Sequence, residues 1–119
     1  MTGNGRVSWF EVVGRDGDAL RAFYGELFGW KLVPHEGSDY HVTPDGWDGV
    51  PGGVGTVPQG QGWATFYVKV DDVEAAVARA VGRGGRVLMP RTDLPHGTTI
   101  AVVADPEGHP VGLSCTREA

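Results

Sequence analysis

Two segments of the sequence, 56 residues apart, alternate polar or aromatic side chains with apolar ones. Val7 to Val13 alternates apolar residues with Trp9 and Glu11, a pattern typical of a strand with two different faces. Thr65 to Val70 has the same pattern. If the apolar positions face helices, alternation places the other residues together on the opposite face of a sheet. These residues are Trp9, Glu11, Thr65, Tyr67 and Lys69.

This set has the residue types of a small-molecule site and of acid–base chemistry. Aromatic rings supply contact area, and a few polar groups supply orientation. Glu11 suits a general base or acid, with Tyr67 beside it as a hydrogen-bond donor. The structural alternative is that Glu11 pairs with Lys69 or faces a dimer interface, with Trp9 in the core.

Two further tryptophans, Trp47 and Trp63, lie in glycine-rich flanks rather than in strand interiors. A large aromatic side chain is costly to expose there. Either residue therefore caps the predicted site, closes an oligomer interface, or fixes a loop. Phe28 and Trp30, where a predicted helix ends, are assigned to the core.

The elements that must position these residues follow a βαβββ order twice. After the first strand, Asp16 or Asp18 begins a helix that ends at Phe28 before Gly29. Strands are predicted at 30–33, 40–42, 54–57, 65–70, 86–89, 98–104 and 110–115. A second helix spans about 73–83. The predicted domain is 1–119, with module one at about 6–58, a linker at 59–62 and module two at 63–117.

An internal repeat supports the duplication. A shift of 56 positions aligns Phe10 with Phe66, Asp16 with Asp72 and Gly29 with Gly85, which are a strand core, a helix cap and a helix stop. Five further identities extend the register: Val12/Val68, Ala19/Ala75, Ala22/Ala78, Leu32/Leu88 and Pro34/Pro90. We therefore interpret the chain as a tandem duplication.

Four phrases, in this order and spacing, resemble the vicinal oxygen chelate superfamily of glyoxalase I, extradiol dioxygenases and bleomycin-resistance proteins. They are Phe10-Glu11-Val12, Phe23-Tyr24-Gly25-Glu26-Leu27-Phe28-Gly29-Trp30, Val70-Asp71-Asp72-Val73-Glu74-Ala75-Ala76-Val77 and Asp105-Pro106-Glu107-Gly108-His109. The resemblance implies an α+β fold in which two tandem βαβββ modules form a curved, cup-shaped mixed β-sheet. Members of the superfamily have several different functions on this fold, so the resemblance does not predict which function this chain has.

In metal-dependent members, the resemblance implies four side chains, usually His, Gln or Glu, around an open divalent ion. Carried over by motif, the first-strand ligands fall at Trp9 and Thr65, and the last-strand ligand at Gly112. The 56-residue shift puts the fourth at Thr56. Trp and Gly offer no suitable atom, and two neutral hydroxyls do not make a stable site. We therefore expect no metal cofactor, and these four positions become candidate ligand-binding residues.

Histidines and the cysteine give little support to a relocated site. His35, His41, His96 and His109 form no His-x-His or His-x-x-x-His pair. Cys115 is the only cysteine, which excludes an intrachain disulfide. It lies in an apolar run that predicts a strand.

The composition is that of an ordinary globular protein, with 40% hydrophobic residues and a net charge of -5. The ten basic residues are scattered, so nucleic acid is not an expected partner. No apolar stretch is long enough to span a bilayer, and no secretory signal is visible. We expect a cytoplasmic protein.

Three functions stay open. The first is a metal-free protein that binds an aromatic or cationic small molecule, as the bleomycin-resistance branch implies. Trp9, Glu11, Thr56, Trp63, Thr65, Tyr67 and Gly112 are its candidate ligand-binding residues. The second is a metal-independent isomerase, epimerase or cyclase that uses Glu11 and Tyr67. The third is a glyoxalase- or dioxygenase-type metalloenzyme with relocated ligands. The resemblance also implies a homodimer, with or without exchange of modules.

Overall fold

The computed structural model describes residues 5–57 and 62–116, which pack into two compact units. One unit runs from Trp9 to Thr65, and the other combines the residues before Trp9 with those from Phe66 onward. The division falls a few residues after the predicted linker, most of which lies outside the described residues. The predicted module boundaries themselves stay predictions.

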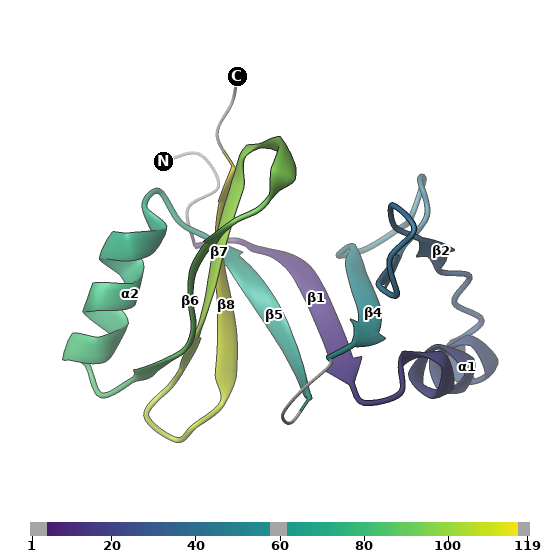
Figure 1. The fold of residues 1–119 in the computed structure, drawn as a ribbon, viewed down its shortest axis with the longest axis horizontal. Helices are drawn as coiled ribbons and strands as arrows, with labels where there is room; N and C mark the ends of the chain where they lie inside the picture. The colour runs from purple at the N-terminus through teal and green to yellow at the C-terminus, as the bar shows by residue number, and fades with distance from the viewer. Residues whose placement is uncertain (1–4, 58–61, 117–119) are drawn as a thin grey trace. The chain divides into compact units, whose positions relative to one another are not determined.

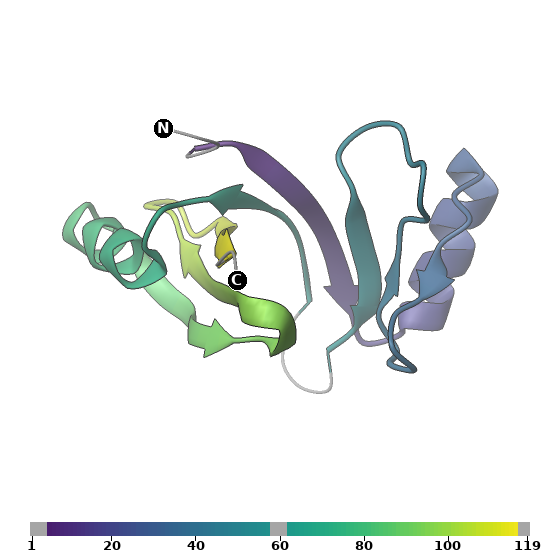
Figure 2. The ribbon, with the colours of Figure 1, turned by 90° about the horizontal axis from the view of Figure 1, so that it is seen from above.

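The unit Trp9–Thr65 contains a small mixed sheet and one helix. Its elements are β1 (Val7–Gly14, from Trp9 on), α1 (Gly17–Phe28), β2 (Val33–Pro34), β3 (His41–Val42) and β4 (Gly52–Thr56). β1 pairs in parallel with β4, and β3 is antiparallel to both β4 and β2. Helix α1 packs against β4 and flanks this sheet (Figures 1 and 2). Val54, on β4, is fully buried.

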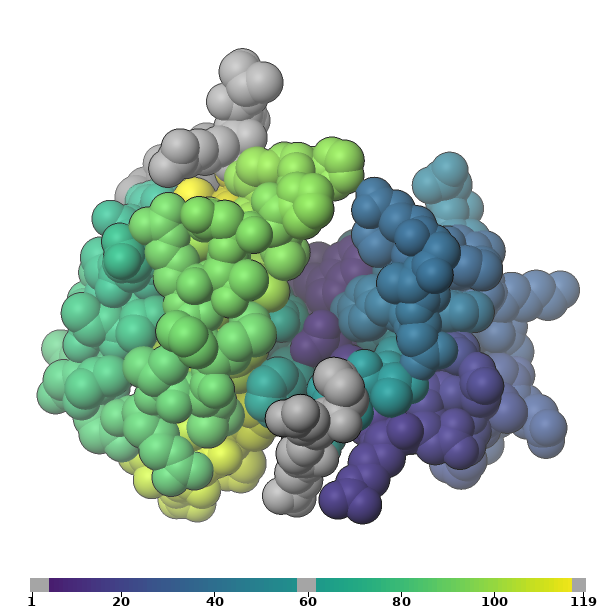
Figure 3. Space-filling view, viewed as in Figure 1, coloured from purple at the N-terminus to yellow at the C-terminus, as the bar shows by residue number. Residues whose placement is uncertain are grey.

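The other unit has the same element order. It holds β5 (Trp63–Lys69, from Phe66 on), α2 (Val73–Gly82), β6 (Arg86–Asp93), a short 3-10 turn (Pro95–Gly97), β7 (Thr98–Ala104) and β8 (Pro110–Thr116). β8 is parallel to β5 and antiparallel to β7, which pairs with β6. Helix α2 covers this sheet, with Ala76, Val103 and Leu113 in the core between them. Residues of β6 and β7 form much of this unit's surface in Figure 3.

Both helices begin where the sequence predicts. Asp16 accepts from the backbone N–H of Ala19 at 3.0 Å, and Asp72 accepts from that of Ala75 at 3.1 Å. Each carboxylate thereby satisfies a donor that the first helical turn leaves unpaired. Gly29, at φ 75°, ends α1 in a left-handed conformation that favours glycine.

The Asp105-Pro106-Glu107-Gly108 phrase forms the predicted turn between β7 and β8. Asp105 Oδ1 accepts from the backbone N–H groups of Glu107 and His109, both at 2.9 Å. The His109 hydrogen bonds lower the pKa of Asp105 below its usual value. The motif is therefore explained by turn geometry.

The α+β class, the repeated βαβββ order and the mixed strand pairing are confirmed, but some details differ. The strand predicted at 30–33 is instead a two-residue strand at Val33–Pro34, and Trp30, before it, packs its ring on Phe10 and Tyr24 at 5.3 and 5.4 Å between centroids. Phe28, assigned to the core, is 58% exposed. Among the described residues, no helix is long and apolar enough to cross a membrane.

Candidate functional site

The Glu11 carboxylate is the centre of a hydrogen-bonded cluster in the unit Trp9–Thr65. The Tyr40 hydroxyl donates to Glu11 Oε1 at 3.0 Å, and the Trp63 indole N–H donates to Oε2 at 2.9 Å. All three residues are partly buried. The protein therefore presents a donor to each oxygen of one half-buried carboxylate. We call Trp9, Glu11, Tyr40 and Trp63 the Glu11 cluster.

Trp9 completes this cluster and sets its polarity. Its indole N–H donates to the Tyr40 hydroxyl oxygen at 2.8 Å. An indole N–H has no acceptor capacity, so Tyr40 is the acceptor in this bond and directs its own hydrogen to Glu11. The chain of hydrogen bonds from Trp9 through Tyr40 consequently runs in one direction, towards the carboxylate.

The sheet explains why these side chains meet. Trp9 and Glu11 share one face of β1 by strand alternation, as predicted, while Phe10 faces the other way and contacts Trp30. Glu11 is paired with Gly53 of β4. A Cβ at Gly53 or Gly55 would collide with the Tyr40 ring, so these glycines leave the space that the ring occupies beside Glu11.

Tyr40 is the residue that sequence reasoning missed. It was noted as part of a short strand, and Tyr67 was expected to supply the phenol near Glu11. A signal was present in the glycines that alternate through Gly53-Val54-Gly55, since two strand glycines on one face can mark the close approach of another group. Nothing in the sequence identifies the side chain that approaches.

Thr56 does not take the position that the repeat assigned to it. Glu11 and Tyr67 are 56 positions apart, but their partners in the last strands, Gly53 and Gly112, are 59 positions apart. The counterpart of Gly112 is therefore Gly53, because the connections before the last strands differ in length. Thr56 Oγ1 instead accepts from the backbone N–H of Gly17 at 2.9 Å, at the start of α1.

Thr56 also belongs to a polar cluster that joins α1 to the segment before β3. A hydrogen bond from Thr56 and the neighbouring Arg21 guanidinium hold the pKa of Asp39 below its usual value. Arg21 donates to the Asp39 side chain at 3.1 Å and to its backbone carbonyl at 2.9 Å. This arrangement anchors the segment that carries Tyr40.

Tyr67 and Gly112 lie in the other unit, where they contact each other. The two residues are paired across β5 and β8, and a Cβ at Gly112 would collide with the Tyr67 ring. Tyr67 is 6% exposed, and its ring lies against Gly112. Its predicted catalytic role beside Glu11 stays a prediction. Thr65 is half-buried two residues after Trp63, on the same face of β5.

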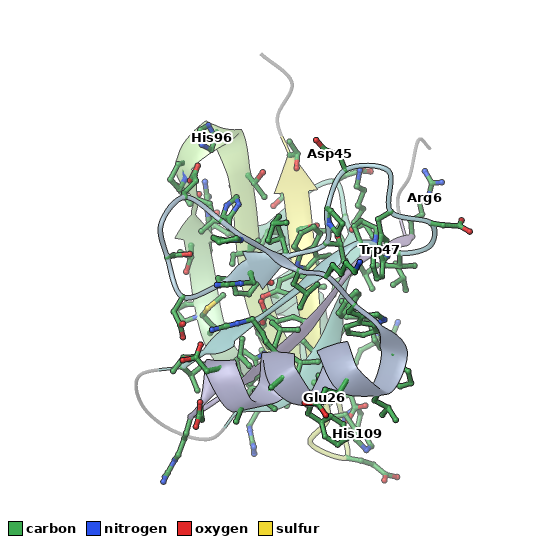
Figure 4. The ribbon with its side chains drawn as sticks, turned by 90° about the vertical axis from the view of Figure 1, so that its right-hand side faces the viewer. Arg6, Glu26, Asp45, Trp47, His96 and His109 are labelled. Atoms are coloured by element: carbon green, nitrogen blue, oxygen red, sulfur yellow. The ribbon has the colours of Figure 1, made fainter. Side chains whose placement is uncertain are left out.

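The remaining tryptophan and the cysteine have local partners. Trp47, labelled in Figure 4, packs edge-on against Trp30 at 5.9 Å and donates its indole N–H to the Val50 carbonyl at 3.2 Å. It therefore fixes a loop, one of the alternatives predicted for it. Cys115 lies in β8, as expected, and its thiol donates to the Asp71 carbonyl at 3.4 Å.

The residues at the family's metal positions do not fit a metal ion. With the corrected register these positions are Trp9, Gly53, Thr65 and Gly112, which offer no carboxylate or imidazole. His96 and His109 lie in separate turns at opposite ends of β7 (Figure 4). Within residues 5–57 and 62–116, no three His, Cys, Asp or Glu side chains are grouped so that they could hold a metal.

Comparison with known proteins agrees with this fold. The model of the glyoxalase-like domain matches residues 10–114. A Mycobacterium bovis protein named "Putative glyoxylase CFP32" is 34% identical over 92% of this chain, which spans 45% of that relative's length.

Two solved structures share the fold at low sequence identity. Methylmalonyl-CoA epimerase from Mycobacterium tuberculosis has a TM-score of 0.65 and 14% identity, over 99% of this chain and 93% of its own. A glyoxalase/bleomycin resistance protein/dioxygenase superfamily member from Vibrio splendidus has a TM-score of 0.63 and 17% identity, over 94% and 99%. The chain belongs to the glyoxalase-like domain family, within the vicinal oxygen chelate superfamily.

Proposed function

We propose that this domain binds a small aromatic or cationic organic molecule at the Glu11 cluster without using a metal ion. The observation that carries the proposal is the Glu11 carboxylate, which accepts hydrogen bonds from Tyr40 and Trp63 on a face also lined by Trp9. A fixed carboxylate gives orientation, and aromatic side chains give contact area, which are the usual components of a small-molecule site. The net charge of -5 favours a cationic ligand.

Intrinsic tryptophan fluorescence tests this proposal directly, because two of the four tryptophans belong to the Glu11 cluster. The protein is titrated with bleomycin and a panel of planar aromatic natural products, both charged and neutral. We expect at least one cationic compound to change the emission saturably, and Glu11→Gln to weaken that binding about tenfold.

Trp47→Phe is the matched control for this titration. It removes a tryptophan of the same unit whose indole hydrogen bond goes to Val50 rather than to Glu11. Its titration should keep the wild-type affinity. If no compound of the panel changes the emission of the wild-type protein, the proposal is contradicted.

A second candidate is a metal-independent isomerase, epimerase or cyclase. The observation that favours it is the 3.0 Å hydrogen bond between the Tyr40 hydroxyl and Glu11, which pairs a carboxylate with a proton donor. Glu11 would exchange a proton with the substrate, and Tyr40 would hold the carboxylate in place. A substrate screen in which Glu11→Gln keeps every activity found for the wild type would exclude this assignment.

We also propose that the domain forms a homodimer, as the family resemblance implies. Sedimentation velocity at several protein concentrations measures this. A mass of one chain at all concentrations would contradict it.

A further inference from the structure

We propose that Trp9 and Tyr40 are positioning residues that hold Glu11 as a fixed anion, and that the site thereby selects a cationic head group over a neutral one. This inference rests on the proposed function, since it assumes that a ligand meets Glu11. It adds a ligand class and assigns a role to two residues that do not need to touch the ligand.

The first step is the polarity of the cluster. Trp9 donates to Tyr40, Tyr40 donates to Glu11 Oε1, and Trp63 donates to Glu11 Oε2. An ionised carboxylate is an acceptor at both oxygens, so it matches the two donors. Hydrogen bonds to charged groups are also stronger than those between neutral groups. The arrangement therefore suits the carboxylate anion.

The second step is the rigidity of Tyr40. Its backbone N–H donates to Ser38 Oγ at 3.2 Å, and its carbonyl accepts from the backbone N–H of His35 at 3.1 Å. The preceding carbonyl, that of Asp39, is held by Arg21. Gly53 and Gly55 leave room for the ring on β4. Tyr40 is thus fixed by its backbone and by its ring, independently of any ligand.

The third step is what a preorganised anion does to recognition. A cationic head group gains a charge-assisted contact with Glu11 and can lie against the neighbouring aromatic rings. A neutral head group of similar size must compete with water for the same carboxylate and gains less. Since Glu11 is already oriented before binding, little ordering cost reduces this difference. The cluster should consequently discriminate by charge.

The test compares two soluble probes that share one ring, benzylamine as the cation at pH 7 and benzyl alcohol as the neutral probe. Binding is followed by NMR titration of the tryptophan indole N–H signals, since Trp9 and Trp63 report from the cluster and Trp47 does not. For the wild type we expect tighter binding of benzylamine, with shifts concentrated at Trp9 and Trp63.

Three variants separate positioning from a structural role. Tyr40→Phe keeps the ring but removes the hydroxyl, and we expect the ratio of the two affinities to fall about tenfold. Trp9→Phe should lower the same ratio through Tyr40, so it should have no further effect when Tyr40→Phe is present. This non-additivity identifies residues that act through one another. Trp47→Phe should leave the ratio unchanged.

The outcomes distinguish this inference from the proposed function. Equal affinity of the wild type for both probes, an unchanged ratio in Tyr40→Phe, or additive effects of the two substitutions would overturn the positioning role and leave small-molecule binding in place. If neither probe shifts any indole signal and no compound of the natural-product panel changes the tryptophan emission, both this inference and the proposed function are overturned. Near-UV circular dichroism confirms that each variant is folded before titration.

Discussion

Gly53 leaves the space that the Tyr40 ring occupies, and it therefore allows the Tyr40 hydroxyl to reach Glu11. The glycine is buried on β4, opposite Glu11 on β1, and its backbone is not in the left-handed region that only glycine favours. Its importance is therefore steric, since an added methyl group would meet the Tyr40 ring.

We predict that Gly53→Ala destabilises the protein by about 1–3 kcal/mol, the usual cost of overpacking a close contact. It should also abolish the charge preference of the site, because the Tyr40 ring must move. Chemical denaturation measures the first effect, and the probe titration measures the second. Gly82→Ala is the matched control, since a Cβ at the end of α2 meets nothing within 4 Å. Equal stability of Gly53→Ala and the wild type would contradict this prediction.

At this scale three of the four residues of the Glu11 cluster are among the candidates that the sequence provides. Alternation along one strand is a local property, so Trp9 and Glu11 were placed on a common face without knowledge of the fold. Trp63 was included as a flanking aromatic. Tyr40 was missed because its contact with Glu11 depends on the segment between α1 and β3. The path of this segment is fixed by tertiary contacts of Arg21 and Gly53 and by a local hydrogen bond from Tyr40 to Ser38.

Between elements, the Asp39, Arg21 and Thr56 contacts connect the segment before β3 with α1 and β4. The lowered pKa of Asp39 means that its carboxylate is more stable as an anion in the folded protein than in the unfolded chain. Its contribution to stability is therefore present above the ordinary value of 3.8 and is lost as the pH falls through the lower folded value.

We predict that Asp39→Asn lowers the melting temperature at pH 5–7 and that this difference shrinks as the pH falls below about 3.8. The reason is that acid removes from the wild type the charge that the variant already lacks. Thermal unfolding followed by circular dichroism across this range measures it. Asp45→Asn, in an exposed loop, is the control. A difference that is independent of pH would show that the charge of Asp39 is not the cause.

The 56-residue repeat predicts some element boundaries correctly and others wrongly. It identified both helix caps, since capping depends on a few neighbouring residues. It failed for Thr56, because the connection from the helix to the last strand differs by three residues between the modules. The strand predicted at 30–33 is found at Val33–Pro34, where it pairs with the two residues of β3.

For the whole molecule, the duplicated fold was predictable and the chemistry was not. Two copies of one pattern, with helix N-caps at matching positions, define the α+β fold, and the family comparison agrees with it. The helix stops differ, since α2 ends at Gly82 rather than at Gly85. The same fold supports metal-dependent and metal-free functions, so the choice depends on which side chains occupy a few positions. In this chain the family's metal positions hold one tryptophan, one threonine and two glycines.

We predict that protein purified without chelator contains no stoichiometric divalent metal and that a chelator leaves its melting temperature unchanged. The four family positions provide no set of ligands that would bind such an ion. Elemental analysis by mass spectrometry, with buffer as the blank, measures the content. One metal ion per chain would revive the glyoxalase- or dioxygenase-type alternative with relocated ligands.

In each half of the duplication an aromatic ring covers the last-strand glycine that is paired with Glu11 or with Tyr67, but the ring comes from a different place. In the second half it is Tyr67, the first-strand residue itself, which covers Gly112; in the first half it is Tyr40, from another segment, which covers Gly53. Because a separate segment supplies the ring in the first half, the first-strand position there does not need an aromatic side chain and carries the Glu11 carboxylate. One copy could thus keep the architecture while the other acquired a new task, which is how a duplicated gene can diverge without losing its fold.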